Sequence, residues 1–388
     1  MYIPRDINPE LLTLTREYPI VTLLGPRQAG KTTLAKKALP DYAYSNLEDP
    51  ETREFAEQDP KAYLKRFPGK TILDEIQRVP KLLSYLQVEV DAHPENGRFI
   101  LTGSHQLSLR EAVTQSLAGR TAILTLLPLS IHELQKAGIR YPDFSDYCFT
   151  GFLPRIYEQS QRPVRAYGNY YQTYVERDVR QLINLKDHTL FEKMLKLIAG
   201  RVGQLMDYSA LSNDVGVDSK TIRNWISILE ASFILFKLPP YFENFGKRVI
   251  KSPKYYFTEP GLLCFLLGIR EPEQVQRDPL VGSIFENLVV IEALKTRFNA
   301  GEPADLYFFR DSKGNEVDLL SGTGRNLFAA EIKSASTFSH KQLTGLQRFQ
   351  ELSHNVERGM LIYTGQNYDL SEGLYARHFS DTNTMFTR

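Results

Sequence analysis

The sequence GPRQAGKT at residues 25–32 matches the pattern GxxxxGK[ST] in full and follows the apolar run IVTLLG at residues 20–25. Glycines let backbone N–H groups curl around phosphate oxygens without Cβ clashes. The next helix is expected to begin at about Lys31 and to direct its positive end at the anion. We expect Lys31 to reach the β- and γ-phosphates and the Thr32 hydroxyl to bind Mg²⁺. The predicted nucleotide-binding residues are Gly25, Pro26, Arg27, Gln28, Ala29, Gly30, Lys31, Thr32 and Thr33.

Five short apolar runs in the first third of the chain alternate with longer helix-like segments. Runs of this length between helices favour buried parallel strands in an α/β sheet. The strand and the helix that flank the glycine-rich loop argue against a chance match in a turn. Asn8, Asp49 and Asp59 each precede a proline, which is typical of a helix N-cap followed by proline at the first helical position. The five runs lie at residues 20–25, 42–48, 70–76, 98–104 and 121–130.

The third run ends in Asp74 and Glu75. An aspartate at the end of such a strand can hold Mg²⁺ or its water shell, as a Walker B residue does. The neighbouring Glu75 is then placed to polarise the attacking water as general base. The alternative is a surface glutamate that simply follows a strand.

Two further candidate catalytic residues lie near the later runs. Ser104, at the tip of the strand expected beside the glycine-rich loop, could contact the γ-phosphate or the water, whereas His105 reads equally well as a loop histidine. Arg120 fits either an arginine finger or sensor, or a solvated salt bridge.

The composition is that of a globular protein with more than one domain. The chain has 388 residues, 42% of them apolar and 24% charged, with a formal net charge of +1. This charge excludes the basicity of a small DNA-coating protein but leaves room for a local basic groove. Two cysteines, no signal-like N-terminus and no long apolar run predict a cytoplasmic protein without a membrane segment.

The middle of the chain predicts a connector and a helix-turn-helix. Residues 141–165 are rich in aromatics, proline and glycine, and a helical pattern follows over residues 167–185. Arginines in that pattern, near Asp178, fit either contact with a neighbouring subunit's nucleotide or an ion-paired helix. Residues 206–241 then show a helix, a turn at Gly216, a cap at Asp218, a second amphipathic helix and a hairpin-like segment, the layout of a winged helix-turn-helix. The side chains in question are Arg177 and Arg180 in the helical pattern, and Lys220, Arg223 and Asn224 as candidates to meet phosphate or base edges.

The last third holds the spacing E…D…ExK of a PD-(D/E)xK nuclease core. Glu286 lies in a helical stretch, Asp318 in the strand-like EVD, and Glu331 and Lys333 in the strand-like AAEIKSA. Carboxylates of this kind bind a divalent metal that polarises a phosphodiester and its water. Glu331 and Lys333 share one strand face, so Lys333 could orient the water or stabilise the transition state. The predicted metal ligands are Glu286, Asp318 and Glu331 here, and Thr32 and Asp74 at the glycine-rich loop.

Several blocks resemble the bacterial and archaeal AAA-type ATPases that carry a C-terminal DUF4143 region, and the resemblance covers nearly the whole chain. In that family Gln77 matches a glutamine of the LDEIQ block, whereas His105 stands where a small hydroxyl residue is common. The resemblance implies ATP as the nucleotide and a nuclease-like C-terminal fold. The blocks are GPRQAGKTTLAKKAL, NLEDPETREFAEQDPKAYL, ILDEIQRVPKLLSYLQVEVD, RFILTGSHQLSL and LAGR.

The predicted fold class is α/β, in three domains. Residues 1–140 form an AAA-type P-loop ATPase domain with a parallel sheet, residues 141–245 a helical connector with a winged helix-turn-helix, and residues 246–388 a restriction-endonuclease-like α/β domain. The predicted function is an ATPase using ATP and Mg²⁺ and acting on DNA, with a homo-oligomer as a candidate assembly and no membrane partner. The alternatives are a slow-turnover signalling switch whose C-terminal domain binds a partner without cleavage, and a non-catalytic DNA-binding regulator.

Overall fold

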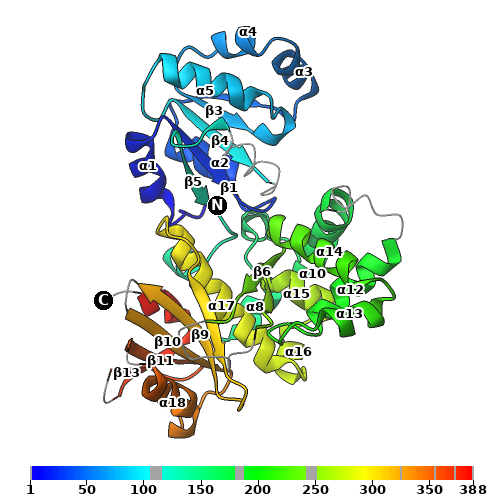
Figure 1. Ribbon diagram of the computed structural model, residues 1–388, viewed down its shortest axis with the longest axis vertical. Helices are drawn as coiled ribbons and strands as arrows, with labels where there is room; N and C mark the ends of the chain where they lie inside the picture. The colour runs from blue at the N-terminus through cyan, green and yellow to red at the C-terminus, as the bar shows by residue number, and fades with distance from the viewer. Residues whose placement is uncertain are drawn as a thin grey trace. The chain divides into compact units, whose positions relative to one another are not determined.

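The computed structural model divides into two compact units (Figure 1). The first comprises Met1–Leu129, Ala231–Phe233 and Arg297–Glu302, and the second comprises Ser130–Glu230, Ile234–Thr296 and Pro303–Arg388. The three predicted domain boundaries stay a prediction. The structure describes residues 2–104, 116–179, 188–241, 251–323, 326–353, 355–370 and 373–386.

The first unit is built on a five-stranded sheet of order β2-β3-β4-β1-β5, in which every pair of neighbours is parallel. All five predicted strands are confirmed. Strands β1, β3 and β4 are buried along their whole length, as expected where helices cover both faces of a parallel sheet. The strands are β1 (Ile20–Leu24), β2 (Ala43–Asn46), β3 (Thr71–Asp74), β4 (Phe99–Gly103) and β5 (Thr121–Thr125).

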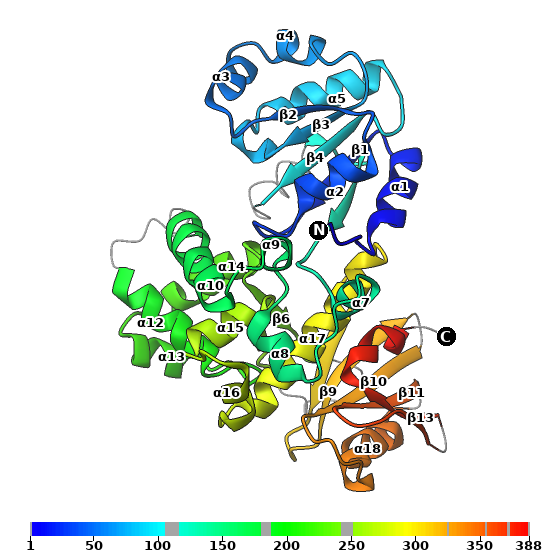
Figure 2. The same ribbon diagram turned by 180° about the vertical axis from the view of Figure 1, so that it is seen from behind.

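Helices lie on both faces of this sheet. Figures 1 and 2 view the sheet from opposite sides, with α5 in front in the first view and α2 in front in the second. The helices are α1 (Asn8–Glu17), α2 (Lys31–Ala38), α3 (Pro50–Gln58), α4 (Pro60–Lys65), the 3-10 turn η1 (Ile76–Arg78) and α5 (Leu82–Ala92).

The predicted helix caps were correct at two of three positions. Asp49 accepts a hydrogen bond from Thr52 N at 2.9 Å, and Asp59 accepts one from Ala62 N at 2.9 Å. The prediction for Asn8 was wrong, because Asn8 is itself the first helical residue and Ile7 holds the N-cap position without a side-chain bond.

The middle of the chain is helical. The expected connector at residues 141–165 contains the short helices α8 and α9, in which several aromatic residues are buried. The elements are α7 (Ile131–Lys136), α8 (Phe144–Thr150), α9 (Pro154–Glu158), α10 (Pro163–Tyr170), the π-helix η2 (Tyr171–Val179), α12 (His188–Ala199), α13 (Tyr208–Val215), α14 (Ser219–Ala231), α15 (Pro260–Leu266) and α16 (Pro272–Arg277).

The helix pair α13–α14 has the predicted layout. Gly216 ends α13 with a left-handed backbone, φ 92°, and Asp218 caps α14 by accepting from Thr221 N at 2.9 Å. The following strand, β6 (Leu235–Leu238), pairs antiparallel with β7 (Lys254–Phe257), which lies further along the chain than the expected hairpin.

The C-terminal part holds a mixed six-stranded sheet of order β12-β13-β11-β10-β9-β8. Strands β10 and β11 are parallel, β9 is antiparallel to both its neighbours, and the edge strand β12 is two residues long. At the other edge, residues 239–241 bond to Phe308 of β8. The elements are α17 (Val281–Asn299), β8 (Leu306–Arg310), β9 (Glu316–Thr323), β10 (Asn326–Lys333), η4 (His340–Leu343), α18 (Thr344–Leu352), β11 (Val356–Tyr363), β12 (Tyr368–Asp369), β13 (Leu374–His378) and η5 (Phe379–Phe386).

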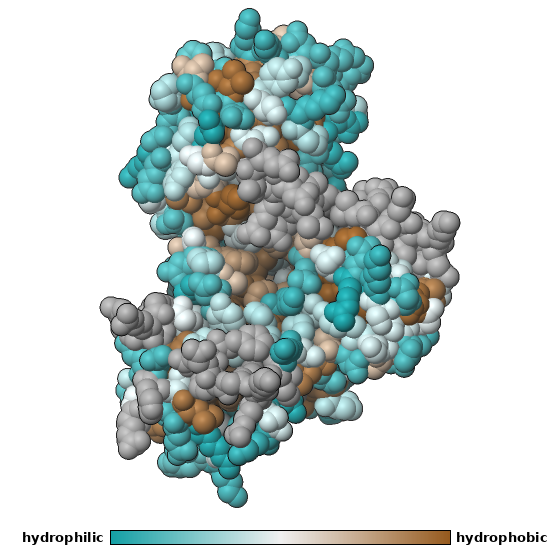
Figure 3. Space-filling model, viewed as in Figure 1, coloured by the Kyte–Doolittle hydropathy of each residue, from teal (hydrophilic) through white to brown (hydrophobic). Residues whose placement is uncertain are grey.

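No helix in the described part of the chain combines the length and the apolar character needed to cross a bilayer. On the face seen in Figure 3, the exposed side chains of the first unit, at the top of the picture, are mostly hydrophilic.

Candidate functional site

The glycine-rich loop joins β1 to α2, and two of its glycines are required by geometry. A Cβ on Gly25 would lie 2.0 Å from the carbonyl oxygen of Leu126, so a side chain does not fit there. Gly30 holds the N-cap position of α2 with a left-handed backbone, φ 91°. Glycine adopts this conformation without steric cost, and the loop therefore keeps its curl.

The Lys31 ammonium is buried inside this loop. Lys31 is 6% exposed, and its Nζ donates to the carbonyl oxygens of Gly25 at 2.9 Å and Pro26 at 2.8 Å. Burial lowers the pKa of Lys31 to about 8, against the opposing effect of the nearby Glu75 and Asp74 carboxylates. The loop thus holds its own positive charge at the centre of the cradle that would receive phosphate oxygens.

A buried arginine from the N-terminal segment supports the loop from behind. The Arg5 guanidinium donates to Ala29 O at 2.7 Å, to Leu127 O at 2.7 Å and to Pro128 O at 3.3 Å. These bonds tie the loop to the segment that follows β5. The sequence gives no local signal for this role, since 24 residues separate Arg5 from Ala29.

Oxygen donors suited to Mg²⁺ lie beside the lysine. The Thr32 hydroxyl is 3.0 Å from both carboxylate oxygens of Asp74, which is 5% exposed. A threonine hydroxyl and a strand-end carboxylate are hard oxygen ligands of the type that Mg²⁺ takes. The residues present therefore fit Mg²⁺, and the structure brings together Thr32 and Asp74, each of which was predicted to bind it.

Two residues that the sequence did not single out also hold Asp74. The Tyr44 hydroxyl donates to Asp74 Oδ2 at 2.8 Å, and the Thr102 hydroxyl donates to Asp74 Oδ1. Burial, followed by the bond to Asp74, raises the pKa of Tyr44, so this hydroxyl stays protonated and keeps donating. Both residues lie on strands next to β3 in the sheet, a relation that only strand order reveals.

The Glu75 carboxylate is held by two neighbours. Ser104 Oγ donates to Glu75 Oε2 at 3.1 Å, and Gln77 Nε2 donates to the same oxygen and lies 3.2 Å from Ser104 Oγ. Glu75 itself has a left-handed backbone, φ 57°, and its N–H donates to Thr102 Oγ1 at 3.1 Å. An uncommon backbone at a non-glycine residue is often retained at functional sites. Strand β4, which ends at Gly103 directly before Ser104, pairs with β1 as predicted.

Arg120 does not join this site. Its guanidinium makes two bonds to the Asp91 carboxylate, at 2.6 and 2.8 Å, and its carbonyl accepts from Ile20 N, at the start of β1. The glycine-rich loop follows the other end of β1, so Arg120 lies at the opposite edge of the sheet. The structure agrees with the salt-bridge interpretation and not with a finger that acts on the same chain's nucleotide. His105 and Arg180, and the side chains of Arg177 and Asp178, lie outside the described residues.

A second cluster of charged side chains lies in the C-terminal sheet. Lys333 Nζ contacts Asp318 Oδ2 at 2.9 Å and Glu331 Oε2 at 2.8 Å, and the N–H of Ile332 donates to Asp318 Oδ2 at 2.8 Å. Burial raises the pKa of Glu331 to about 8, and the adjacent Asp318 charge adds to the increase. Burial also opposes ionisation of Asp318, but Lys333 and Lys254 outweigh it and lower the Asp318 pKa.

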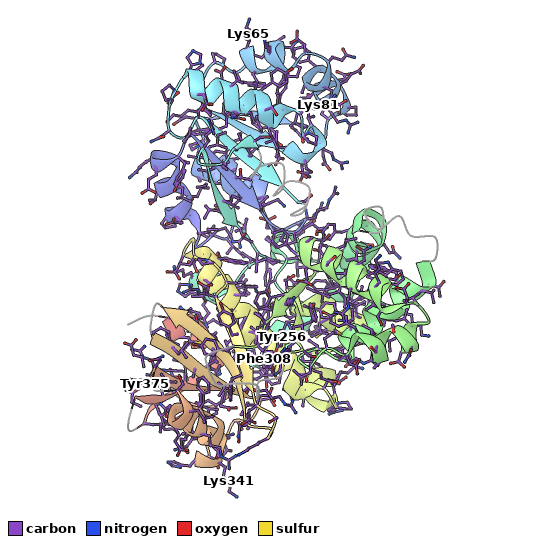
Figure 4. The ribbon with its side chains drawn as sticks, in the orientation of Figure 1. Lys65, Lys81, Tyr256, Phe308, Lys341 and Tyr375 are labelled. Atoms are coloured by element: carbon purple, nitrogen blue, oxygen red, sulfur yellow. The ribbon has the colours of Figure 1, made fainter. Side chains whose placement is uncertain are left out.

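Glu286 reaches the same region from α17, but its partner is a lysine that the sequence did not single out. Lys254 Nζ lies 3.0 Å from Glu286 Oε1 and 2.7 Å from Glu316 Oε1. Tyr256, two residues along β7, donates its hydroxyl to the same Glu286 oxygen. Figure 4 labels Tyr256 and also Phe308, over whose ring Lys254 Nζ lies at 5.3 Å. A signal was present only around 316, where Glu316 and Asp318 lie two residues apart and so share one face of the strand, whereas the segment around 254 shows no such alternation.

The predicted metal ligands Glu286, Asp318 and Glu331 do not fit a divalent ion as they stand. The Lys254 ammonium bonds to the carboxylates of Glu286 and Glu316, and the Lys333 ammonium bonds to those of Asp318 and Glu331. Within the described ranges, no group of three or more His, Cys, Asp or Glu side chains is arranged to hold a metal.

A stripe of exposed polar residues runs along α14. Lys220, Arg223, Asn224 and Ser227 are exposed, while Ile222, Trp225 and Ile226 are buried. The Arg223 guanidinium lies 3.9 Å above the ring of Tyr208, on α13. The N-terminal half of α14 thus presents two cationic side chains and an amide to solvent.

Comparisons with known proteins agree with the P-loop geometry. Three family models match: AAA domain over residues 17–135, a domain of unknown function (DUF8612) over 141–273, and a domain of unknown function (DUF4143) over 281–379. An uncharacterized protein of Mycobacterium tuberculosis is 29% identical over 379 residues, which is 96% of this chain and 82% of the relative. An uncharacterized protein of Haemophilus influenzae is 26% identical over 319 residues, or 78% and 73% of the two chains.

Solved structures with similarity to the chain include two ATP-related proteins. A Walker-type ATPase of Pyrococcus abyssi is similar with a TM-score of 0.46 and 15% identity, covering 68% of this chain and 96% of that one. AMPPCP-bound DnaA from Aquifex aeolicus gives a TM-score of 0.30 and 15% identity, covering 58% and 85%. The family matches, together with the complete glycine-rich loop and its Thr32–Asp74 pair, support an AAA-type P-loop ATPase domain followed by a C-terminal DUF4143 region.

Proposed function

We propose that the protein hydrolyses Mg-ATP with Glu75 as general base and couples this turnover to action on DNA. The observation that supports the first half most strongly is the position of Glu75. Its carboxylate follows Asp74 directly and is held by Ser104 and Gln77 at the edge of the sheet where Lys31 and Thr32 lie. A carboxylate placed in this way can accept a proton from a water molecule.

Bound Mg-ATP would supply the γ-phosphoryl group and the divalent charge that balances it. The Lys31 ammonium would leave the carbonyl oxygens of Gly25 and Pro26 for phosphate oxygens, which are stronger acceptors because they are charged. The Thr32 hydroxyl and the Asp74 carboxylate would hold the metal, and Tyr44 and Thr102 keep that carboxylate in place. Ser104 and Gln77 orient the Glu75 carboxylate, which would take the proton of the attacking water.

The test of this half is a pair of variants with matched controls. Glu75→Gln should bind ATP with unchanged affinity but lose turnover by a factor of about 100 or more, in the range for removal of a general base. The control Glu51→Gln, at an exposed position of α3, should hydrolyse ATP at the parent rate. A Glu75→Gln variant that turns over at the parent rate would remove this residue from the mechanism.

The Lys31→Ala variant tests the cradle itself. It removes the one side-chain ammonium inside the loop, so ATP binding should fall below detection. Lys37→Ala removes an exposed lysine from the same helix, α2, and should leave binding unchanged. Unchanged affinity in Lys31→Ala would reject the P-loop interpretation.

The second half of the proposal assigns DNA contact to the α13–α14 pair as a winged helix-turn-helix. Lys220, Arg223 and Asn224 are exposed on the N-terminal half of α14, where a recognition helix meets base edges and phosphates. The ring of Tyr208 fixes the Arg223 guanidinium. The mixed sheet supports a restriction-endonuclease-like domain, since a helix and two adjacent strands bring Glu286, Asp318 and Glu331 to one cluster.

ATP turnover measured with single-stranded, duplex and branched DNA tests this half. We expect at least one DNA form to stimulate ATP turnover, and we expect the Lys220→Ala/Arg223→Ala variant to lose this stimulation. The DNA affinity of the variant should also depend less steeply on salt concentration, by about one unit of slope per lost phosphate contact. Lys196→Ala, an exposed lysine on α12, is the matched control. Turnover that ignores every DNA form would instead favour the slow signalling switch.

A further inference from the structure

We infer that the acidic centre of the C-terminal sheet is a metal-free cluster, in which the Lys254 ammonium occupies the place where a divalent cation would meet Glu286. This inference goes beyond the proposed function, because it concerns a centre that ATP hydrolysis does not use.

Lys254 is a built-in part of the centre. Its side chain is 4% exposed and its Nζ bonds to Glu286 Oε1 at 3.0 Å and Glu316 Oε1 at 2.7 Å. The ring of Phe308 lies below the ammonium, with 5.3 Å to the ring centroid, and closes it off on that side. A buried ammonium held by two carboxylates and an aromatic ring has a fixed position.

The oxygen of Glu286 that faces the centre is already satisfied. Glu286 Oε1 accepts from both Lys254 Nζ and the Tyr256 hydroxyl. These two donors stand on the same face of β7, because they are two residues apart on a strand. A divalent cation at this oxygen would have to displace a buried ammonium and face a second donor hydrogen.

The charges of the cluster are close to balanced without a metal. Four carboxylates belong to it, those of Glu286, Glu316, Asp318 and Glu331. Three cationic side chains bond to them: Lys254, Lys333 and Arg310, whose Nη1 lies 3.2 Å from Glu316 Oε2. Among the described residues, these four carboxylates and three cationic groups sum to a formal charge of −1, too little to attract a divalent ion strongly into a site that already holds two ammonium groups.

The prediction is a gain of metal binding when the lysine is removed. Mn²⁺ binding is measured by electron paramagnetic resonance on the full chain with Asp74→Ala, which removes the P-loop carboxylate from the count. This parent should show no saturable Mn²⁺ site. Adding Lys254→Ala should create one saturable site and a Mn²⁺-dependent rise in unfolding temperature, and adding Glu286→Gln to that variant should abolish both.

The matched control is Lys237→Ala, which removes an exposed lysine from the neighbouring strand β6 and should create no site. Saturable Mn²⁺ binding by the parent that disappears in Glu286→Gln would overturn the inference, and so would a folded Lys254→Ala variant that gains no site. If Lys254→Ala does not fold, judged by circular dichroism, the parent and its Glu286→Gln variant still decide, because the inference requires both to lack a saturable site.

Discussion

At the scale of single residues, the P-loop is held by Lys31 from within the loop and by Arg5, which is distant in sequence. Lys31 donates a hydrogen bond to the Gly25 carbonyl of the loop, and Arg5 donates one to the Ala29 carbonyl of the same loop. The loop is therefore held in its curled shape by hydrogen bonds from within the protein. Pre-organisation of this kind strengthens binding because less ordering remains to be done.

Arg5→Lys should destabilise the first unit by about 1–3 kcal/mol, because the planar fork that reaches three carbonyls is replaced by a single ammonium. It should also weaken ATP binding, since Ala29 O belongs to the loop. Denaturant unfolding and ATP titration measure the two effects. An unchanged affinity would mean that the loop keeps its shape without this support.

Arg120→Ala should leave ATP turnover of the same chain unchanged, because the guanidinium pairs with Asp91 at the edge of the sheet opposite the loop. Steady-state turnover at saturating ATP is the measurement, with Asp91→Asn as the matched partner variant. A severe loss in Arg120→Ala but not in Asp91→Asn would restore the finger hypothesis, with the residue acting on another subunit.

The residues proposed to bind phosphate and metal could be selected from the sequence because they belong to a local pattern. Lys31, Thr32 and Asp74 follow strands at fixed distances, and the structure brings them together. The residues that position them could not, because Tyr44 and Thr102 reach Asp74 only through the order of strands in the sheet. Lys254 was missed for the same reason, since its partner lies 32 residues away on a helix.

At the scale of elements, buried strands were easier to predict than caps and connectors. Runs of apolar residues between helices identify parallel strands because both faces of such a sheet are covered. A cap is a single position, so an error of one residue is enough to make its prediction wrong. Asn8 was predicted as an N-cap but is the first residue of its helix. Strand partners were harder still, because β6 pairs with β7 across an intervening segment and not within a tight hairpin.

Helix α18 approaches the charged cluster closely at a glycine. A Cβ on Gly345 would lie 2.0 Å from Glu331 Oε1 and 2.6 Å from the backbone oxygen of Glu316, so Gly345→Ala should destabilise the protein by about 1–3 kcal/mol. Gly282→Ala, in α17 with nothing within 4 Å of its Cβ position, is the control and should be neutral or slightly stabilising. Denaturant unfolding compares the two; equal effects would show that Glu331 yields without cost.

At the scale of the whole molecule, the nucleotide should stabilise one unit directly. Ligand at about 100 times its Kd adds about 2.7 kcal/mol to the stability of the folded state that binds it. Hydrogen exchange should therefore slow at residues 25–33 and 74–77 when a non-hydrolysable ATP analogue and Mg²⁺ are added, and should return to the starting rate when EDTA removes the metal. Protection confined to the C-terminal sheet would contradict the assigned site.

The second unit should show a pH dependence that comes from a buried glutamate. Burial raises the pKa of Glu259, whose Oε1 accepts from Phe152 N, the Tyr167 hydroxyl and Gly261 N. A raised pKa in the folded state means that its stabilising contribution is complete below the unfolded pKa and is lost as pH rises through the folded one. Glu259→Gln keeps an acceptor oxygen without a charge, so its stability relative to the parent should increase with pH, measured by denaturant unfolding between acidic and mildly alkaline buffers. A flat difference would exclude Glu259 as the source.

The margins of the six-stranded sheet have a consequence for handling the protein. A long edge strand with unpaired backbone groups can pair with a strand of another chain, and this pairing is a common cause of aggregation. Here one margin is a two-residue strand that ends in the acidic Asp369, and the other is covered by residues 239–241. Internal deletion of residues 368–370 would uncover β13, so we expect this deletion variant to precipitate on concentration while the intact chain does not.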